Sequence, residues 1–196
     1  MMERPCIVVA GMGRCGTSLM MQMLEAAGVP CVGEWPAFET NASGLQGFNP
    51  TSFVARRNEA IKLIDPANFT IPNVAGRVLI WLDRNSRQQA RSQVKFMTAL
   101  GAPIANSRHA IRVLDADLRR TRSTHRAALG DCPTVEIAFE DLIDQPKETA
   151  AKVATFLAQH QWFVDAVAMA REIVPRQSDC LPHLLEAQFI CEADHA

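Results

Sequence analysis

The sequence lacks the features that mark several large classes of protein. Its longest unbroken apolar stretches, such as residues 78–82, fall far short of the roughly 20 residues that a membrane helix needs. The 20 Lys and Arg residues against 21 Asp and Glu residues give a formal net charge of -1, so no overall basic field points to nucleic acid. No repeat, low-complexity tract or Pro/Gly/Ser-rich linker interrupts the chain. We therefore expect neither a membrane span nor a nucleic-acid partner.

Cysteine and histidine patterns are equally sparse. The six cysteines form no C-x-x-C pair, and the five histidines show no spacing suited to sharing a metal ion, so we expect neither a metal site nor a disulfide framework. The N-terminus carries no signal-peptide pattern, which predicts a cytoplasmic protein. A length of 196 residues, with 48% hydrophobic and 21% charged residues, predicts a single folded domain over residues 1–196.

Short apolar runs alternate along the chain with segments of helical periodicity. The pattern predicts strands at 6–10, 30–33, 77–83 and 134–139, and helices at 17–27, 86–100, 106–130 and 146–160, with one more helix that is capped by Thr51 and contains Arg57, Asn58 and Glu59. Buried strands joined by helices indicate an α/β fold: a three-layer P-loop-type architecture whose central parallel sheet has four to five strands. Such folds bind ligands at the carboxyl ends of the strands.

Two further segments carry expectations. The loop at 41–50 is rich in Gly and Asn and is a candidate lid or acceptor-site wall. Near the end of the chain, Trp162, Phe163 and Val167 are interpreted as core or interface residues of a final amphipathic helix.

A first candidate anion site follows the first predicted strand. Residues 11–18 read Gly-Met-Gly-Arg-Cys-Gly-Thr-Ser and open a helix, with the G-x-x-x-x-G spacing of a phosphate-binding loop. Glycines there let backbone N–H groups surround an anion at the positive end of the helix dipole. Thr17 stands where a nucleotide triphosphatase carries its Lys, and Arg14 is the cation within the loop. Its guanidinium can donate two hydrogen bonds to a phosphate or a sulfonate.

A second candidate anion site follows the apolar strand at 77–83. Arg84 comes directly after the strand, and Ser92 lies eight residues further, on the next helix. A planar guanidinium and a hydroxyl brought together at the strand end can bind one phosphate. Two anion sites at one sheet edge suit a ligand with two separated anionic groups.

These motifs resemble those of the sulfotransferases that use 3′-phosphoadenosine 5′-phosphosulfate (PAPS). Residues 13–18 are similar to the family's 5′-phosphosulfate loop, with Gly13 for its Pro and Cys15 for its usual Ser. The strand, Arg84 and Ser92 are similar to its 3′-phosphate motif. Two other segments add to the resemblance, Gly44 to Pro50 and Phe139 to Pro146. Without a Lys-Gly-rich C-terminal segment, the chain is closer to the tyrosyl-protein, glycan and bacterial branches than to the cytosolic aryl and steroid enzymes.

The resemblance implies the transfer of a sulfuryl group from PAPS to a hydroxyl or amine, without a metal, releasing adenosine 3′,5′-bisphosphate (PAP). The acceptor would be a small molecule, a glycan or a peptide. The residues implied in binding the donor are Arg14, Cys15, Gly16, Thr17, Ser18, Arg84 and Ser92. Arg176 is a candidate for a further nucleotide contact. The resemblance does not indicate an oligomeric state.

Catalysis would need a cation at the transferring group and a base at the acceptor proton. We predict Arg14 as the cation. For the base we predict Glu34, since tyrosyl-protein sulfotransferases carry a Gly-Glu-Glu at this offset from the loop Arg; here Trp35 replaces the second acid. Glu39 and His109 are alternatives.

Cys15 stands at a helix N-terminus beside Arg14, a setting that can lower a thiol pKa. We nevertheless assign it to loop packing rather than to nucleophilic catalysis, because the resembling family forms no covalent intermediate.

Two rival functions stay open. Asp83 ends an apolar strand, as does the magnesium-binding acid of P-loop kinases, although Thr17 cannot supply the cation that those enzymes need. The other rival is a nucleotide-binding protein without transferase activity. The arginines of the helix at 106–130 are interpreted as a solvated face interspersed with Asp115 and Asp117, rather than as a site for an acidic substrate.

Overall fold

The computed structural model describes residues 3–39, 56–71 and 76–173 of the chain. Three sequence-based predictions lie outside these residues: the candidate lid at 41–50, the helix cap at Thr51 and the nucleotide contact of Arg176.

The centre of the molecule is a parallel sheet of four strands. In chain order the strands are β1 (Cys6–Gly11), β2 (Ala60–Ile64), β3 (Arg77–Asp83) and β4 (Thr134–Ala138). Their order across the sheet is β2-β1-β3-β4, and every neighbouring pair is parallel. The predicted α/β fold with a parallel sheet of four to five strands is confirmed.

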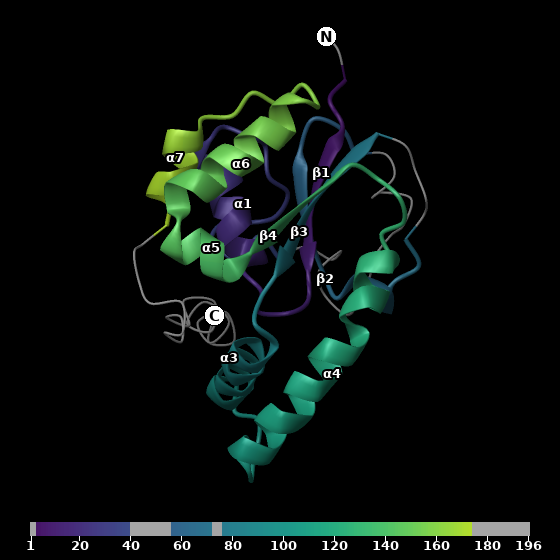
Figure 1. Cartoon of the computed structure of the whole chain (residues 1–196), viewed down its shortest axis with the longest axis vertical. Coiled ribbons are helices and arrows are strands. Elements are labelled where there is room, and N and C mark those ends of the chain that lie inside the picture. The colour runs from purple at the N-terminus through teal and green to yellow at the C-terminus, as the bar shows by residue number, and fades with distance from the viewer. Residues whose placement is uncertain (1–2, 40–55, 72–75, 174–196) are drawn as a thin grey trace.

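Helices follow each of three strands and flank the sheet (Figure 1). The helices are α1 (Thr17–Ala26), α3 (Ser86–Ala99), α4 (Ser107–Ala127), α5 (Phe139–Asp144), α6 (Pro146–Ala158) and α7 (Ala166–Arg171), with a short 3-10 helix η1 (Pro66–Asn68). The four predicted helices that begin near residues 17, 86, 107 and 146 are confirmed to within a few residues at each end. Asn85 and Asn106 cap α3 and α4 by accepting hydrogen bonds from backbone N–H groups of their first turns.

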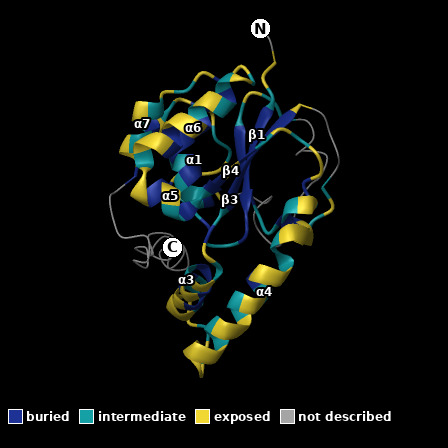
Figure 2. Ribbon diagram, in the orientation of Figure 1, coloured by how far each residue is buried: buried dark blue, intermediate teal, exposed yellow. Residues whose placement is uncertain are grey.

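The sheet is buried on both faces, because successive strand residues point to opposite sides. Ile7 and Val9 pack in the larger hydrophobic cluster, with α1, α5, α6 and α7 over that face (Figure 1). Val8 and Ala10 face a smaller cluster, which includes Leu129 just after α4. Figure 2 shows the strands buried, whereas α4 is exposed along most of its length and projects with α3 beyond the sheet.

Two sequence-based predictions of secondary structure were wrong. The predicted strand at 30–33 is reduced to a single bridge between Cys31 and Ala60. The helix predicted over 57–59 is absent; Asn58 has a φ of 60°, which is unfavourable in a helix interior, and strand β2 follows at once. The strand predicted at 134–139 is confirmed and ends one residue earlier, where α5 begins.

The C-terminal aromatic residues divide between core and surface. Trp162 is buried, and its indole N–H donates to the carbonyl oxygen of Pro5 at 2.9 Å. Phe163 and Val167 are exposed, which excludes the core for these two residues; that they lie in an interface stays a prediction. No helix in the described part of the chain combines the length and apolarity that crossing a membrane requires.

Candidate functional site

Both predicted anion motifs lie at the carboxyl edge of the sheet. Because β1, β2 and β3 are parallel neighbours, their last residues all meet at this edge. The loop at 12–16 leaves β1, Asp65 leaves β2 and Arg84 leaves β3. Phe139, the first residue of α5, follows β4 at the same edge.

Close packing of the loop explains two of its glycines. A Cβ atom on Gly11 would lie 2.4 Å from the Cys15 sulfur and 2.6 Å from the Leu82 carbonyl oxygen. Gly16 has a φ of 103°, and a Cβ there would lie 2.7 Å from the ring of Phe139. The turn therefore excludes larger side chains at both positions.

Helix α3 orients the peptide groups of the loop. The buried side chain of Gln89 donates from Nε2 to the carbonyl oxygens of Met12 and Gly13 at 3.1 and 2.8 Å, and Gln93 donates to the second of these at 3.0 Å. A trans peptide places the next N–H on the side opposite its carbonyl. The N–H groups of Gly13 and Arg14 consequently point away from α3, and that of Gly13 donates to the Asp65 carboxylate at the end of β2.

The two motifs meet through their side chains. Arg14 Nε donates to Ser92 Oγ at 3.4 Å, and Arg84 Nη1 donates to the Arg14 carbonyl oxygen at 3.1 Å. Arg84 is only 3% exposed, and its guanidinium stacks 4.1 Å from the ring centroid of Phe139. Arg14 lies over Phe96 at 4.8 Å. Two arginines 70 positions apart in the chain thus form one cationic cluster with Ser92; that these groups bind a nucleotide stays a prediction.

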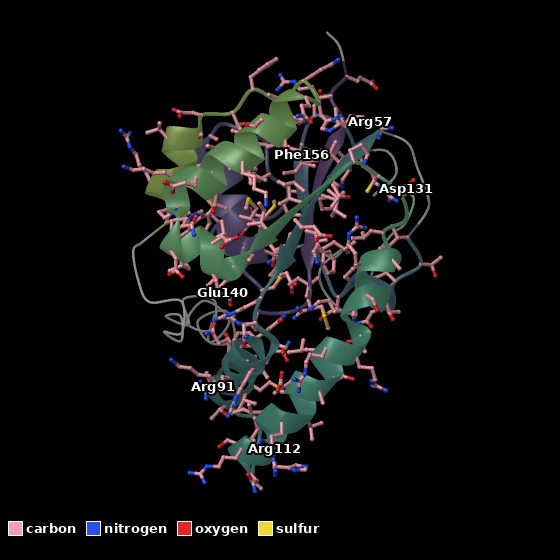
Figure 3. The ribbon with its side chains drawn as sticks, viewed as in Figure 1. Arg57, Arg91, Arg112, Asp131, Glu140 and Phe156 are labelled. Atoms are coloured by element: carbon pink, nitrogen blue, oxygen red, sulfur yellow. The ribbon has the colours of Figure 1, made fainter. Side chains whose placement is uncertain are left out.

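The segment at 139–146, which adds to the sulfotransferase resemblance, also contacts the second anion motif. Glu140, in the first turn of α5, accepts a hydrogen bond from the Asn85 backbone N–H at 3.1 Å. Figure 3 shows Glu140 at the end of α5 that faces α3. This contact joins the start of α5 to Asn85, the cap of α3.

An acid at the end of β2 also contacts the loop. Asp65 Oδ1 accepts a hydrogen bond from Gly13 N at 3.1 Å. Burial raises the pKa of the Asp65 carboxyl, while the Gly13 hydrogen bond and the nearby His125 partly offset that rise. Nothing in the local sequence indicated this contact, since 52 residues separate its partners.

Cys15 is fully packed inside the loop. Burial raises the pKa of its thiol to about 12, with Asp65 as the second cause. The lowered pKa that its position beside Arg14 can produce is therefore absent, and the assignment of Cys15 to loop packing is supported over that of a reactive thiolate.

Lys62 is the functional candidate that the sequence analysis missed. It lies in the middle of β2, and its side chain is 0% exposed. Its ammonium donates to Ser18 Oγ at 3.2 Å, to Glu39 Oε1 at 2.6 Å and to the carbonyl oxygen of Ala37. A second cation thus contacts the first turn of α1. The available signal was a lysine inside the otherwise apolar run Ala-Ile-Lys-Leu-Ile.

The three candidate bases occupy different surroundings. Glu39 pairs with Lys62 and through it reaches Ser18. Glu34 is exposed, at the turn where its carbonyl accepts a hydrogen bond from Phe38 N at 2.7 Å. His109 is exposed in the first turn of α4, where its backbone N–H is capped by Asn106.

Asp83 is engaged by neighbouring donors. Arg122 Nη1 lies 2.8 Å from one of its carboxylate oxygens, which also accepts a hydrogen bond from Arg84 N at 2.8 Å. Arg122 further donates to the Arg84 carbonyl oxygen at 2.8 Å. Asp83 therefore joins α4 to the end of β3.

The fold is similar to that of solved sulfotransferase structures. A sulfotransferase domain from the curacin biosynthetic pathway superimposes with a TM-score of 0.51 at 14% identity, covering 98% of each chain. A sulfotransferase from Alicyclobacillus acidocaldarius gives a TM-score of 0.55 at 13% identity, over 97% of this chain and 91% of that one. Neither a family model nor a curated protein matches the sequence. At these identities the likeness establishes the fold.

Proposed function

We propose that the protein is a PAPS-dependent sulfotransferase. The observation that carries this proposal is the contact between the two anion motifs: Arg14, Ser92 and Arg84 meet at the carboxyl edge of the sheet. A donor with a 5′-phosphosulfate and a separate 3′-phosphate has the two anionic groups that such a pair of motifs would bind. The shared fold of the solved sulfotransferases supports the same proposal.

In the proposed reaction, the acceptor hydroxyl or amine attacks the sulfur of PAPS in line with the leaving phosphate. A bond forms between the acceptor and sulfur, and the bond between sulfur and the bridging phosphate oxygen breaks, which releases PAP. Residues 14–18 would hold the 5′-phosphosulfate, and Arg84 and Ser92 the 3′-phosphate. The Arg14 guanidinium and the N–H groups at the start of α1 would stabilise the charge that develops on the departing phosphate. Lys62 would add a second cation through Ser18.

The acceptor proton needs a base. We propose Glu34 for this role, with Glu39 as its alternative because the latter contacts Lys62. Glu34→Gln and Glu39→Gln variants separate the two. The variant that removes the base should lose transfer activity and its dependence on pH while keeping its affinity for PAP. Loss of PAP affinity instead would identify a binding residue.

The experiment that tests the proposal is titration calorimetry of the purified protein with PAP, ADP and ATP, each with and without Mg²⁺. We expect PAP to bind most tightly and independently of Mg²⁺. A preference for ATP with Mg²⁺ would contradict the proposal in favour of a small-molecule kinase. If PAP binds but no acceptor from a small-molecule, glycan and peptide screen is sulfated, a nucleotide-binding protein without transferase activity is favoured.

A further inference from the structure

A second cationic site lies outside the cluster around Arg14, in a groove between α3 and α4. The groove has a volume of about 640 Å³. Four arginines line it, two from each helix: Arg87 and Arg91 from α3, and Arg108 and Arg112 from α4. Figure 3 shows Arg91 and Arg112 at the end of the molecule where these helices project beyond the sheet.

The arginines form two pairs, one on each helix, that line the same groove. Each pair is four residues apart, which is about one helical turn, or roughly 5–6 Å along the helix. The helices run alongside each other, and Ser86 Oγ on α3 donates to Asp115 Oδ1 on α4 at 2.6 Å. The four guanidinium groups are thus gathered around one hollow instead of being spread over a helix face.

Among the described residues, the four groove arginines have no acidic partner, in contrast to Arg119 and Arg120 of α4. Arg119 pairs with Asp115 at 3.0 Å, and Arg120 pairs with Asp117 at 2.6 Å. Asp115 and Asp117, the acids interspersed among the arginines of this helix, are therefore paired with Arg119 and Arg120. Within the described part of the chain, the four groove arginines are exposed and form no hydrogen bond or ion pair.

Four guanidinium groups and one carboxylate, that of Asp115, line the groove, and the carboxylate is engaged by Ser86 and Arg119. The four like charges repel one another, and an anion placed among them would reduce that repulsion. Guanidinium groups stay charged at any physiological pH and bind carboxylates or phosphates through two parallel hydrogen bonds. Among the residues that the structure describes, the lining includes one aliphatic side chain, Ile111, and no aromatic ring, so these residues offer no stacking surface for a base. The volume lies within the range of small-ligand sites.

We propose that the α3–α4 groove binds a small polyanion with two or more anionic groups about 5–6 Å apart. The site is separate from the proposed donor site, although both use α3. Ser92 is buried against Arg14 on one side of that helix, whereas Arg91 is exposed in the groove.

The test is titration calorimetry of the full chain with inorganic tripolyphosphate and with citrate, at matched ionic strength. The unaltered protein should bind both. The Arg91→Ala/Arg112→Ala variant should bind each at least about tenfold more weakly, because every charge-assisted pair lost is expected to cost that much or more. All the groove arginines are exposed, so this variant should fold normally, which a thermal melt can verify.

The matched control is Arg120→Ala/Lys147→Ala, which removes the same charge from exposed positions outside the groove. Its affinity should stay within about twofold of the unaltered protein. Equal weakening in the control and the groove variant would overturn the proposal, since it would reveal only a diffuse field. Binding of heparin or DNA but of neither small polyanion would also overturn it.

An Arg84→Ala variant separates this proposal from the proposed donor site. Tripolyphosphate and citrate should still bind to it. If their binding disappears in Arg84→Ala but survives in the groove variant, the polyanions occupy the donor site and the groove proposal fails. Neither result depends on whether PAP binds.

Discussion

At the scale of single residues, the candidate site is built from charged side chains that are buried and shared. The Arg84 guanidinium donates to the carbonyl oxygen of Arg14 and stacks on Phe139, and the Arg84 carbonyl oxygen accepts a hydrogen bond from Arg122. The Lys62 ammonium likewise donates hydrogen bonds to both Ser18 and Glu39. Burying such charges is costly unless they are hydrogen-bonded, so their contacts with the loop give it a defined shape as well as a positive potential.

Replacing Arg84 with alanine should weaken PAP binding strongly. The change removes one or two charge-assisted bonds to the 3′-phosphate, about 1.5–6 kcal/mol, or roughly one to four decades of affinity. Titration calorimetry with PAP measures the effect, and a thermal melt checks that the variant is folded. Arg119→Ala, a change at an exposed arginine of α4, is the control and should bind PAP normally. Unchanged affinity in Arg84→Ala would rule out the proposed 3′-phosphate site.

Asp65 should make the protein less stable as pH rises. Its pKa is raised in the folded state, so between its unfolded and folded pKa values the folded protein binds more protons than the unfolded one. Stability from this group is full below the unfolded pKa and declines as pH rises through the folded pKa.

The Asp65→Asn variant removes this titration while retaining an oxygen that can accept from Gly13 N. Urea denaturation from pH 3.5 to pH 7 should therefore show the variant gaining stability relative to the unaltered protein as pH rises. A difference that stays constant across this range, or that changes in the opposite direction, would contradict the raised pKa.

At the scale of elements, the loop between β1 and α1 is shaped by its neighbours. Gln89 and Gln93 of α3 orient its carbonyls, and Phe139 at the start of α5 packs against Gly16. The site is therefore a junction of β1, α3 and α5, and a change in the packing of one element should be transmitted to the other two.

Gly16→Ala should destabilise the protein more than a comparable change elsewhere. The new Cβ would combine a left-handed φ of 103° with an overlap against Phe139, at a cost of about 2–4 kcal/mol. Gly28→Ala is the matched control, because Gly28 also has a positive φ, of 80°, but no heavy atom lies within 4 Å of the added Cβ. Its cost should be about 1–2 kcal/mol. Denaturant titration measures the free energy of unfolding of the two variants. Equal losses of this free energy would show that the Phe139 contact does not add to the cost.

At the scale of the whole molecule, the donor should bind between elements that lie far apart in the chain. Residues from β1, β2, β3 and α3 form the candidate site, so a bound nucleotide would tie the edge of the sheet together. The α3–α4 groove lies further out, where these helices project from the sheet (Figure 1). Ligands at the two places should therefore stabilise the molecule independently.

PAP should raise the melting temperature of the protein. At a concentration about 100 times its dissociation constant, a ligand that binds only the folded state adds about 2.7 kcal/mol. For a chain of this size that corresponds to a rise of roughly 5–10 °C. Differential scanning fluorimetry measures the shift, with ATP and Mg²⁺ as the comparison. A larger rise with ATP and Mg²⁺ than with PAP would contradict the proposed donor.

The amino-acid sequence by itself determined the elements with strong local signals. The apolar run of β3, the helical periodicity of α3 and α4, and the Gly-rich turn after β1 are encoded within a few neighbouring residues, so their positions could be predicted. Parallel strands also place the ends of β1 and β3 at one edge, which was enough to bring Arg14 and Arg84 together in the prediction.

Only the tertiary structure decided the rest, because those contacts join residues that are distant in the chain. Strand β2 was missed because its local pattern is weak and its pairing with β1 decides its structure. Lys62 and Asp65, which lie in this strand and just after it, were missed for the same reason. The roles of Gln89 and Gln93 depend on how α3 docks against the loop. The groove arginines look like the rest of a charged helix face in the sequence; which of them pair with an acid depends on side-chain geometry that no spacing rule contains.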